Sequence, residues 1–187
     1  MIAGILLCGG AGRRFGMDKL LAGEEPIVAL AARNLVAGAG NALAVIPPRR
    51  AALRQVLEAE GCTVVESERT SEGMGASLAA AVEASDGAQA WIVALGDMPM
   101  VDPKTIEGVR KALERGAPMA APYDRGGRRG HPVGFARALR EELLSLGGDV
   151  GARDLLARHA AMVERFVTDD PGIFVDIDTK ADLDALR

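Results

Sequence analysis

The chain has 187 residues, of which 49% are hydrophobic and 26% charged, a composition typical of one globular domain. Its formal net charge of −4 and its aromatic content of 3% argue against the basic, base-stacking surface of a nucleic-acid binder. No apolar run approaches the ~20 residues of a membrane span, and the first residues lack the basic segment of a signal peptide. We therefore expect a cytoplasmic protein with no nucleic-acid and no membrane partner.

Short apolar runs alternate with longer amphipathic stretches over the first two thirds of the chain. The pattern predicts strands at 2–8, 42–47, 62–66, 90–95 and 118–123, and helices at 27–38, 48–60, 75–85 and 103–115. Most of these strands are apolar throughout, as expected where helices cover both faces of a parallel sheet. The alternation predicts an α/β fold with right-handed crossovers.

The rhythm changes after residue 123. A polar glycine loop at 124–130 is followed by a predicted strand at 131–135, helices at 136–146 and 151–160, strands at 161–167 and 172–177, and a last helix capped by Thr179. Nothing marks a linker or a repeat, so we predict one domain over residues 1–187. Cys8 and Cys62 lie in apolar, strand-like contexts, which predicts two reduced core residues.

A glycine-rich segment, GGAGRRFGMDK, follows the first strand at residues 9–19. Its bare backbone can bring N–H groups against phosphate oxygens, and its three cations, Arg13, Arg14 and Lys19, suit a triphosphate better than a dinucleotide. Leu20 after the lysine excludes the GxxxxGK[ST] loop, and Phe15 stands where GxGxxG needs its third glycine. A tight turn with solvated arginines is the plain structural alternative.

Two further segments lie where an open α/β sheet binds ligands. Residues 72–78, EGMGASL, open a predicted helix and offer Gly73, Gly75 and the Ser77 hydroxyl at its positive end. Asp97 comes directly after the strand at 90–95, at its carboxyl end. It is either a metal ligand or a turn residue, whereas Asp102 before Pro103 is more simply a helix N-cap.

The last third carries three more polar candidates. His131 stands in GHPVGF, and Asp149 and Arg153 stand at a helix start suited to a phosphate or hydroxyl group. Asp176 and Asp178 alternate in VDIDTKADL, which predicts that they share one face of a strand and contact metal or substrate. The alternative for this stretch is a capping box formed by Thr179 and Asp182.

The first loop resembles the LxGGxxxRxGxxK signature of GT-A-like nucleotidyltransferases. The likeness is greatest to the molybdenum cofactor nucleotidyltransferases, the molybdopterin cytidylyl- and guanylyltransferases. The signature stands here as Leu7, Gly9, Gly10, Arg14, Gly16 and Lys19, and the GMGASL, DMP, GHPV and GDVGAR segments also look like family segments. The resemblance implies a single-domain, Rossmann-like GT-A fold with a mostly parallel twisted sheet. Residues 1–123 would bind nucleotide and residues 124–187 the acceptor.

The same resemblance implies roles for individual residues. The nucleotide would lie on Leu7, Gly9, Gly10, Gly12, Arg13, Arg14, Lys19, Gly73, Gly75 and Ser77. Arg14, Lys19 and Asp97 would be catalytic, and Mg²⁺ would be held by Asp97 together with Asp176 or Asp178. The acceptor would lie on His131, Asp149, Arg153 and Asp178. The chain offers no Ser-His-Asp or Cys-His set for a covalent nucleophile, which phosphoryl-type transfer does not require.

The implied reaction transfers CMP or GMP from an NTP to the phosphate of molybdopterin or the molybdenum cofactor and releases pyrophosphate. Segments 72–78, 130–135 and 147–153 look cytidylyl-like, which favours CTP, but Gly9 in LCGG matches the guanylyl form LAGG. A molybdoenzyme or its chaperone is a further implied partner. The alternatives are another phosphorylated acceptor, a non-catalytic NTP-binding maturation factor for molybdoenzymes and, least favoured, a nicotinamide-dependent oxidoreductase.

Overall fold

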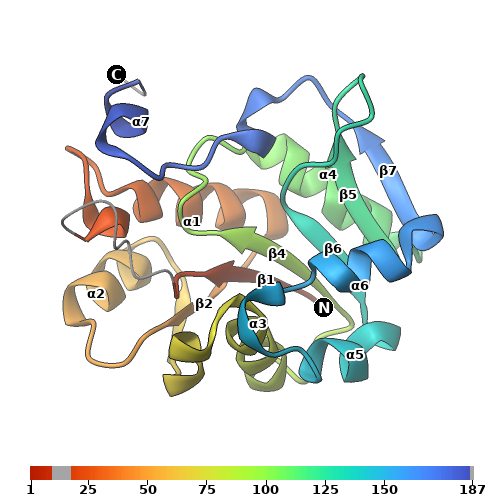
Figure 1. The fold of residues 1–187 in the computed structure, drawn as a ribbon, viewed down its shortest axis with the longest axis horizontal. Coiled ribbons are helices and arrows are strands. Elements are labelled where there is room, and N and C mark those ends of the chain that lie inside the picture. Colours follow the sequence, from red (N-terminus) through yellow and green to blue (C-terminus); the bar gives the residue numbers. More distant parts are fainter. Residues whose placement is uncertain (10–17, 186–187) are drawn as a thin grey trace.

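Seven strands form one mixed sheet in the order β3-β2-β1-β4-β6-β5-β7. The computed structural model describes residues 1–9 and 18–185 (Figure 1). The strands are β1 (Ile2–Leu7), β2 (Leu43–Ile46), β3 (Thr63–Glu66), β4 (Ala90–Leu95), β5 (Met119–Tyr123), β6 (Val133–Ala136) and β7 (Val163–Val167). Only β6 runs antiparallel to its neighbours, β4 and β5, among the described strands. The predicted α/β fold with a mostly parallel sheet is therefore confirmed.

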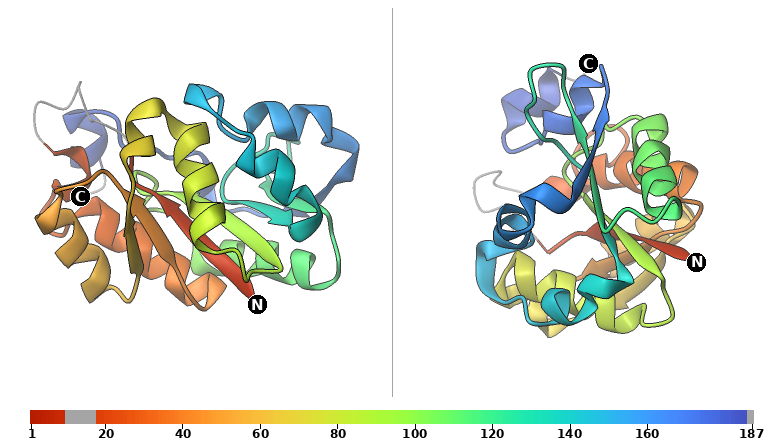
Figure 2. Two further views of the ribbon diagram at one scale, coloured as in Figure 1. Left: turned by 90° about the horizontal axis from the view of Figure 1, so that it is seen from below. Right: turned by 90° about the vertical axis from the view of Figure 1, so that its right-hand side faces the viewer.

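Helices cover both faces of this sheet (Figures 1 and 2). They are α1 (Ile27–Ala39), α2 (Ala51–Ala59), α3 (Met74–Ala84), α4 (Pro103–Glu114), α5 (Arg140–Leu144), α6 (Arg153–Arg158) and α7 (Lys180–Asp184). Asp102 caps α4 by accepting from the Lys104 N–H at 2.8 Å, and Thr179 and Asp182 form the capping box of α7. Within the described ranges, no helix has the length and apolar character needed to cross a bilayer.

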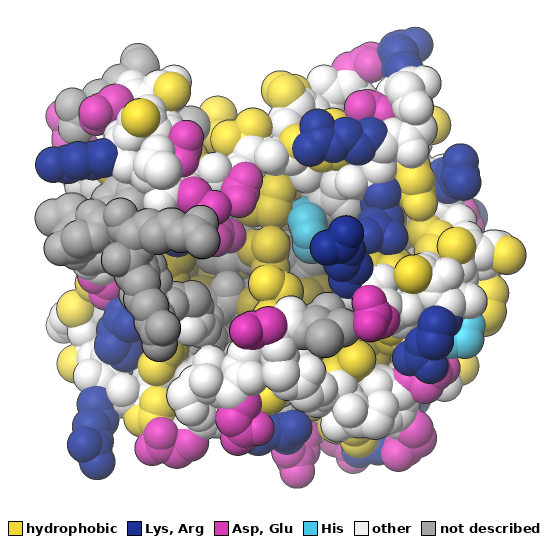
Figure 3. Space-filling view, viewed as in Figure 1, with side chains coloured by type: hydrophobic (Ala, Val, Ile, Leu, Met, Phe, Trp, Pro, Cys, Tyr) yellow, Lys and Arg dark blue, Asp and Glu magenta, His cyan; other side chains and the backbone are white. Residues whose placement is uncertain are grey.

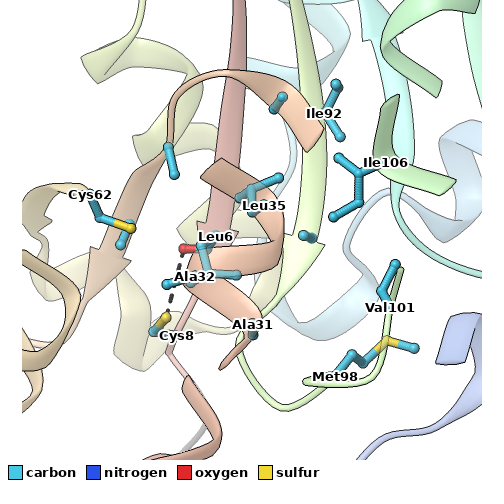
Figure 4. Close-up of a cluster of buried hydrophobic side chains, with 14 of the residues drawn as sticks. Leu6, Cys8, Ala31, Ala32, Leu35, Cys62, Ile92, Met98, Val101 and Ile106 are labelled. Carbon is cyan, nitrogen blue, oxygen red and sulfur yellow. Dashed lines mark hydrogen bonds between the residues drawn. The ribbon is translucent and has the colours of Figure 1, made fainter. Parts of the chain in front are cut away.

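Side chains alternate between two hydrophobic cores, one on each face of the sheet. On β4, Ile92 and Ala94 face α1, α2 and α4, whereas Trp91 and Val93 face α3, α5 and α6. Figure 4 shows part of the first core, in which Cys8 donates a weak hydrogen bond to the Leu6 carbonyl. Both cysteines are buried and reduced, as predicted.

The predicted strand at 172–177 is wrong. Residues Pro171–Phe174 form a 3-10 turn, and the chain after it is extended but pairs with no strand among the described residues. Turn chemistry overrides the apolar pattern here, because the Asp170 side chain accepts from the Gly172 N–H at 2.8 Å. Gly172 also packs directly on backbone, since a Cβ there would lie 1.9 Å from the Met100 carbonyl oxygen.

The two helices predicted at 136–146 and 151–160 are shorter than expected. Ala136 belongs to β6, and a 3-10 turn at Arg137–Leu139 precedes α5. Gly148 and Gly151 adopt φ values of +59° and +55°, left-handed conformations that end regular helix between α5 and α6. This irregular loop before α6 is free to pack against α3.

The chain makes a topological switch beside β1. It leaves β1 for β2 and β3 on one side and then crosses to β4 on the other side. In open α/β sheets, ligands bind at the carboxyl ends of the strands at such a point. The fold therefore directs attention to the ends of β1 and β4.

Candidate active site

The carboxyl ends of β1 and β4 lie side by side, because the two strands pair in parallel along their length. Gly9 follows β1 closely, and Asp97 follows β4 after Gly96. The Gly96 N–H donates to the Leu7 carbonyl at 3.0 Å, and a Cβ on Gly96 would lie 3.0 Å from the Cys8 sulfur. The glycine thus lets the chain turn tightly, and Asp97 emerges at the switch point.

Lys19 places its ammonium group between two carboxylates from distant parts of the chain. Its Nζ lies 2.9 Å from Asp97 Oδ2 and 2.8 Å from Asp178 Oδ1. The side chain of Lys19 is 10% exposed, that of Asp97 27% and that of Asp178 55%. Two charge-assisted hydrogen bonds therefore hold a buried lysine at this edge of the sheet.

The electrostatics of this group favour the charged lysine. Burial by itself lowers the pKa of Lys19, but hydrogen bonds to Asp178 and Asp97 and the charges of both carboxylates outweigh it, so the pKa is raised. Among the described residues, the Asp97 carboxylate hydrogen-bonds to Lys19 and not to its own turn. This counts against the interpretation of Asp97 as a simple turn former.

The C-terminal segment brings Asp178 to the site. Ile177 is fully buried, and its N–H donates to the Asp97 carbonyl at 2.9 Å, so this segment runs beside the turn after β4. Asp176 is exposed and lines a separate hollow next to α7, instead of sharing a strand face with Asp178. The described residues contain no group of three or more His, Cys, Asp or Glu side chains that could hold a metal. The acidic feature of the site is therefore the pair Asp97 and Asp178.

The second glycine segment packs the start of α3 against the loop before α6. Gly73 has a φ of +122°, and a Cβ there would lie 2.4 Å from the Gly148 carbonyl carbon. A Cβ on Gly75 would lie 2.8 Å from the Gly147 carbonyl oxygen. The Ser77 hydroxyl donates to the Gly73 carbonyl at 2.8 Å. Both glycines allow two backbones to touch, and their role in binding nucleotide stays a prediction.

Gly9 is also a glycine that packs closely against neighbouring protein atoms. A Cβ on Gly9 would lie 3.0 Å from Ser77 Oγ and 3.3 Å from the Thr70 Cβ. Thr70 is buried and donates to the Ser67 carbonyl at 2.8 Å, and sequence reasoning missed it. A larger residue at position 9 would press on Ser77 first, so selection of the base by Gly9 stays a prediction. Gly10, Gly12, Arg13 and Arg14 lie outside the described residues.

A cavity of about 250 Å³ opens beside this group, between the ends of β1 and β4 and the helices α3 and α6. Its floor is apolar and includes Leu7, Leu78, Leu95 and Leu156. Its polar lining consists of Arg129, His131, Asp149 and Arg153. The structure thus brings together three of the four predicted acceptor residues, while the fourth, Asp178, pairs with Lys19. A mostly apolar hollow with a few polar groups is typical of a small-molecule site.

His131 is a buried polar group in this cavity. Its Nδ1 has no hydrogen-bond partner among the described residues. Burial lowers the pKa of His131, and so does the positive charge of Arg129, whereas Asp97 acts in the opposite direction. Buried polar atoms are normally paired, so this unpaired Nδ1 in the lining of a cavity is a candidate contact for a ligand.

Arg129 is a cavity residue that sequence reasoning missed. Within the described parts of the chain, neither Arg129 nor Arg153 forms an ion pair, unlike most arginines of this protein. The run GGRR before GHPV was the available signal, but a glycine loop with arginines is usually solvated. Figure 3 shows the face of the molecule seen in Figure 1, where acidic and basic side chains lie across a hollow with a hydrophobic floor.

Comparisons with known proteins show the family and the fold of this chain. Residues 4–163 match the MobA-like NTP transferase domain family. Rv0371c from Mycobacterium tuberculosis H37Rv is 26% identical, with a TM-score of 0.83 over 99% of this chain and 96% of that one. A second structure of Rv0371c, a complex with manganese, gives 24% identity and a TM-score of 0.78 over 99% and 97%. A search of curated proteins found no match.

Two other solved structures share the fold at lower identity. The nucleotidyl transferase Mth528 from Methanothermobacter thermautotrophicus is 22% identical, with a TM-score of 0.81 over 100% of this chain and 96% of that one. Molybdopterin-guanine dinucleotide biosynthesis protein A from Archaeoglobus fulgidus is 19% identical, with a TM-score of 0.67 over 98% and 95%. Because the family match spans most of the 187 residues, the chain belongs to the MobA-like NTP transferase domain family, a family of GT-A-like nucleotidyltransferases.

Proposed function

We propose that this enzyme transfers a nucleoside monophosphate, preferably CMP, from an NTP to the phosphate of molybdopterin or its molybdenum-loaded form. The observation that carries the proposal is the convergence of Lys19, Asp97 and Asp178 at the switch point of the sheet. A triphosphate needs cations, and its metal ion needs carboxylate oxygens. This group supplies one ammonium group and two carboxylates that lie within hydrogen-bonding distance of it.

The pair Asp97 and Asp178 fits a divalent cation. Each carboxylate presents one oxygen to the same ammonium group, so the two oxygens already converge on a single positive charge. Mg²⁺ prefers hard oxygen ligands and typically takes one or two carboxylates plus substrate phosphates. The manganese complex of Rv0371c supports a divalent metal in a relative. When bound, Mg²⁺ would offset the charge of the triphosphate and of the departing pyrophosphate.

The nucleotide would lie along the first loop and the start of α3. Lys19 would leave its carboxylates to bind phosphate oxygens, with Arg13 and Arg14 of the glycine-rich sequence adding charge. The first turn of α3 contributes N–H groups and the positive end of the helix near Gly75 and Ser77.

The acceptor would occupy the cavity beside the metal pair. Its apolar floor suits the face of a heterocyclic ring, and the buried Nδ1 of His131 would hydrogen-bond to a polar ring atom. Arg129 and Arg153 have no acidic partner among the described residues and would hold anionic groups of the acceptor. Asp149 completes the polar rim.

The reaction needs no covalent intermediate. An oxygen of the acceptor phosphate attacks the α-phosphorus of the NTP, and the bond from that phosphorus to the oxygen bridging to the β-phosphate breaks. Pyrophosphate leaves with the electron pair. A phosphate monoester has a second pKa of about 6 and is largely dianionic near neutral pH, so no protein base is required. The work of the protein is to position the two substrates and to stabilise charge.

A nucleotide panel tests this function. The protein would be incubated with Mg²⁺, molybdopterin and each of CTP, GTP, ATP and UTP, and pyrophosphate release would be measured. We expect release with CTP that depends on molybdopterin. Preference for GTP would establish the guanylyl alternative, and release that needs a different phosphorylated acceptor would refute molybdopterin. Binding of NTP without turnover on any acceptor would favour the non-catalytic maturation factor.

A further inference from the structure

The ammonium group of Lys19 occupies the position that a metal ion would need. Both oxygens proposed to bind the metal, Asp97 Oδ2 and Asp178 Oδ1, already accept hydrogen bonds from Lys19 Nζ, at 2.9 and 2.8 Å. A divalent cation on the same two oxygens would lie next to a positive charge. Repulsion at such short range is strong because the Lys19 side chain is only 10% exposed, although that of Asp178 is 55% exposed.

The Lys19 side chain is also held in place in the nucleotide-free enzyme. The residue is 8% exposed, so its charged group is shielded from water and depends on the two carboxylates for compensation. Leaving them requires another anion close by. The triphosphate of a nucleotide, which Lys19 is proposed to bind, is such an anion.

We infer that Lys19 is a built-in counter-ion that closes the divalent-metal site of the nucleotide-free enzyme, and that the triphosphate opens this site by drawing Lys19 away. This inference rests on the proposed nucleotide and metal sites and adds an order of assembly to them. Metal then binds weakly to the free enzyme and strongly once nucleotide is present. By linkage, the metal strengthens nucleotide binding by the same factor.

Mn²⁺ binding to the nucleotide-free protein tests the inference without any turnover. Free Mn²⁺ would be counted by electron paramagnetic resonance during a titration of wild type and of Lys19→Met. Removing the counter-ion should tighten Mn²⁺ binding by roughly tenfold or more. Adding Asp178→Asn to Lys19→Met should abolish this gain. The ratio of Mn²⁺ affinities with and without CTP should be smaller in Lys19→Met than in wild type.

Lys111→Met is the matched control. It removes the same charge from an ion pair of similar length, 2.9 Å to Glu107, on the exposed surface of α4, and should leave Mn²⁺ binding unchanged. Circular dichroism would check that each variant folds. If Lys19→Met does not fold, Lys19→Gln keeps a donor for the carboxylates and carries the same expectation, while Lys19→Arg keeps the charge and should bind Mn²⁺ weakly.

Equal Mn²⁺ affinity in wild type and in a folded, uncharged Lys19 variant would overturn the inference. An equal gain in Lys111→Met would do the same, because it would reduce the effect to net charge. Neither result depends on the acceptor. A clear gain of Mn²⁺ affinity in Lys19→Met, together with no pyrophosphate release by the wild-type enzyme on molybdopterin, would leave the counter-ion role standing and remove the proposed acceptor.

Discussion

Replacing Asp97 by asparagine separates a metal ligand from a turn residue. Asparagine keeps the size of the side chain and serves almost as well in a turn, but it lacks the negative charge. The turn itself is held by backbone contacts, since the Ile177 N–H donates to the Asp97 carbonyl at 2.9 Å and the Met98 N–H donates to the Leu95 carbonyl at 3.2 Å. The fold should therefore survive the change.

The cost in stability can be estimated from the partners of Lys19. After Asp97→Asn, the lysine keeps Asp178 Oδ1 at 2.8 Å and gains a neutral amide oxygen in place of the lost carboxylate. Exchanging a carboxylate acceptor for a neutral amide oxygen, with the ammonium donor still charged, costs about 1 kcal/mol. For a protein of this size, that lowers Tm by about 2–4 °C.

The cost in metal binding should be much larger. One of the two proposed ligand charges is lost, and interactions with charged groups are each worth about 1.5–3 kcal/mol. The loss of one such interaction weakens Mg²⁺ binding by roughly 10- to 150-fold. Pyrophosphate release across a Mg²⁺ titration should shift to higher Mg²⁺, while the thermal melt changes little.

Asp102→Asn is the matched control for this experiment. Asp102 caps α4, and asparagine is as good an N-cap as aspartate, so neither activity nor Tm should change appreciably. Near-native activity of Asp97→Asn at ordinary Mg²⁺ would refute the metal assignment. A large loss of Tm in this variant would contradict the estimated stability cost, because it would show that Asp178 alone does not compensate Lys19.

The remaining predictions concern packing, protonation and the thiols. Gly75→Ala should lower the free energy of unfolding by about 1–3 kcal/mol and raise the KM for the acceptor more than for the nucleotide, because it displaces the loop that carries part of the cavity; equal changes in both KM values would contradict this. His131 should titrate below pH 6.5 by NMR, and Arg129→Gln should raise its pKa; an unmoved pKa would show that the arginine does not face the ring. Because the unfolded chain takes up this proton first, stability should fall as pH drops below 6.5, and less so in His131→Gln. Burial raises the pKa of both thiols, that of Cys62 to about 11, so Cys8 and Cys62 should resist a disulfide reagent at pH 8 until the protein is unfolded.

Local sequence pattern predicts the regular half of this fold well. A run such as AWIVAL is apolar throughout because β4 is buried on both faces. GIFVDI is similarly apolar, but Asp170 and Pro171 before it start a turn, and Gly172 must fit against the backbone at Met100. The contact between Gly172 and the backbone at Met100 is a tertiary one, so the local apolar pattern cannot predict its outcome.

The site shows the same limit. The rule that ligands bind at strand ends predicts from sequence alone that Asp97 belongs to the site. It does not reveal that Lys19 and Asp178 meet Asp97 there. Lys19 lies 78 positions from Asp97 and 159 positions from Asp178 in the sequence, and it hydrogen-bonds to both. A glycine pattern also does not show whether a ligand or a neighbouring backbone occupies the space of the missing side chain. At Gly73 and Gly75, the backbone of the loop before α6 occupies that space.

These long-range contacts bear on the predicted division into a nucleotide-binding part, residues 1–123, and an acceptor-binding part, residues 124–187. Asp178 belongs to the second part but holds the lysine proposed to bind nucleotide in the first. The loop at Gly147 and Gly148 belongs to the second part but packs on the start of α3 in the first. Any movement of Lys19 toward a triphosphate therefore releases a residue of the acceptor part. We therefore predict that the two binding steps are coupled through shared residues, and that a change in either part alters the affinity for both substrates.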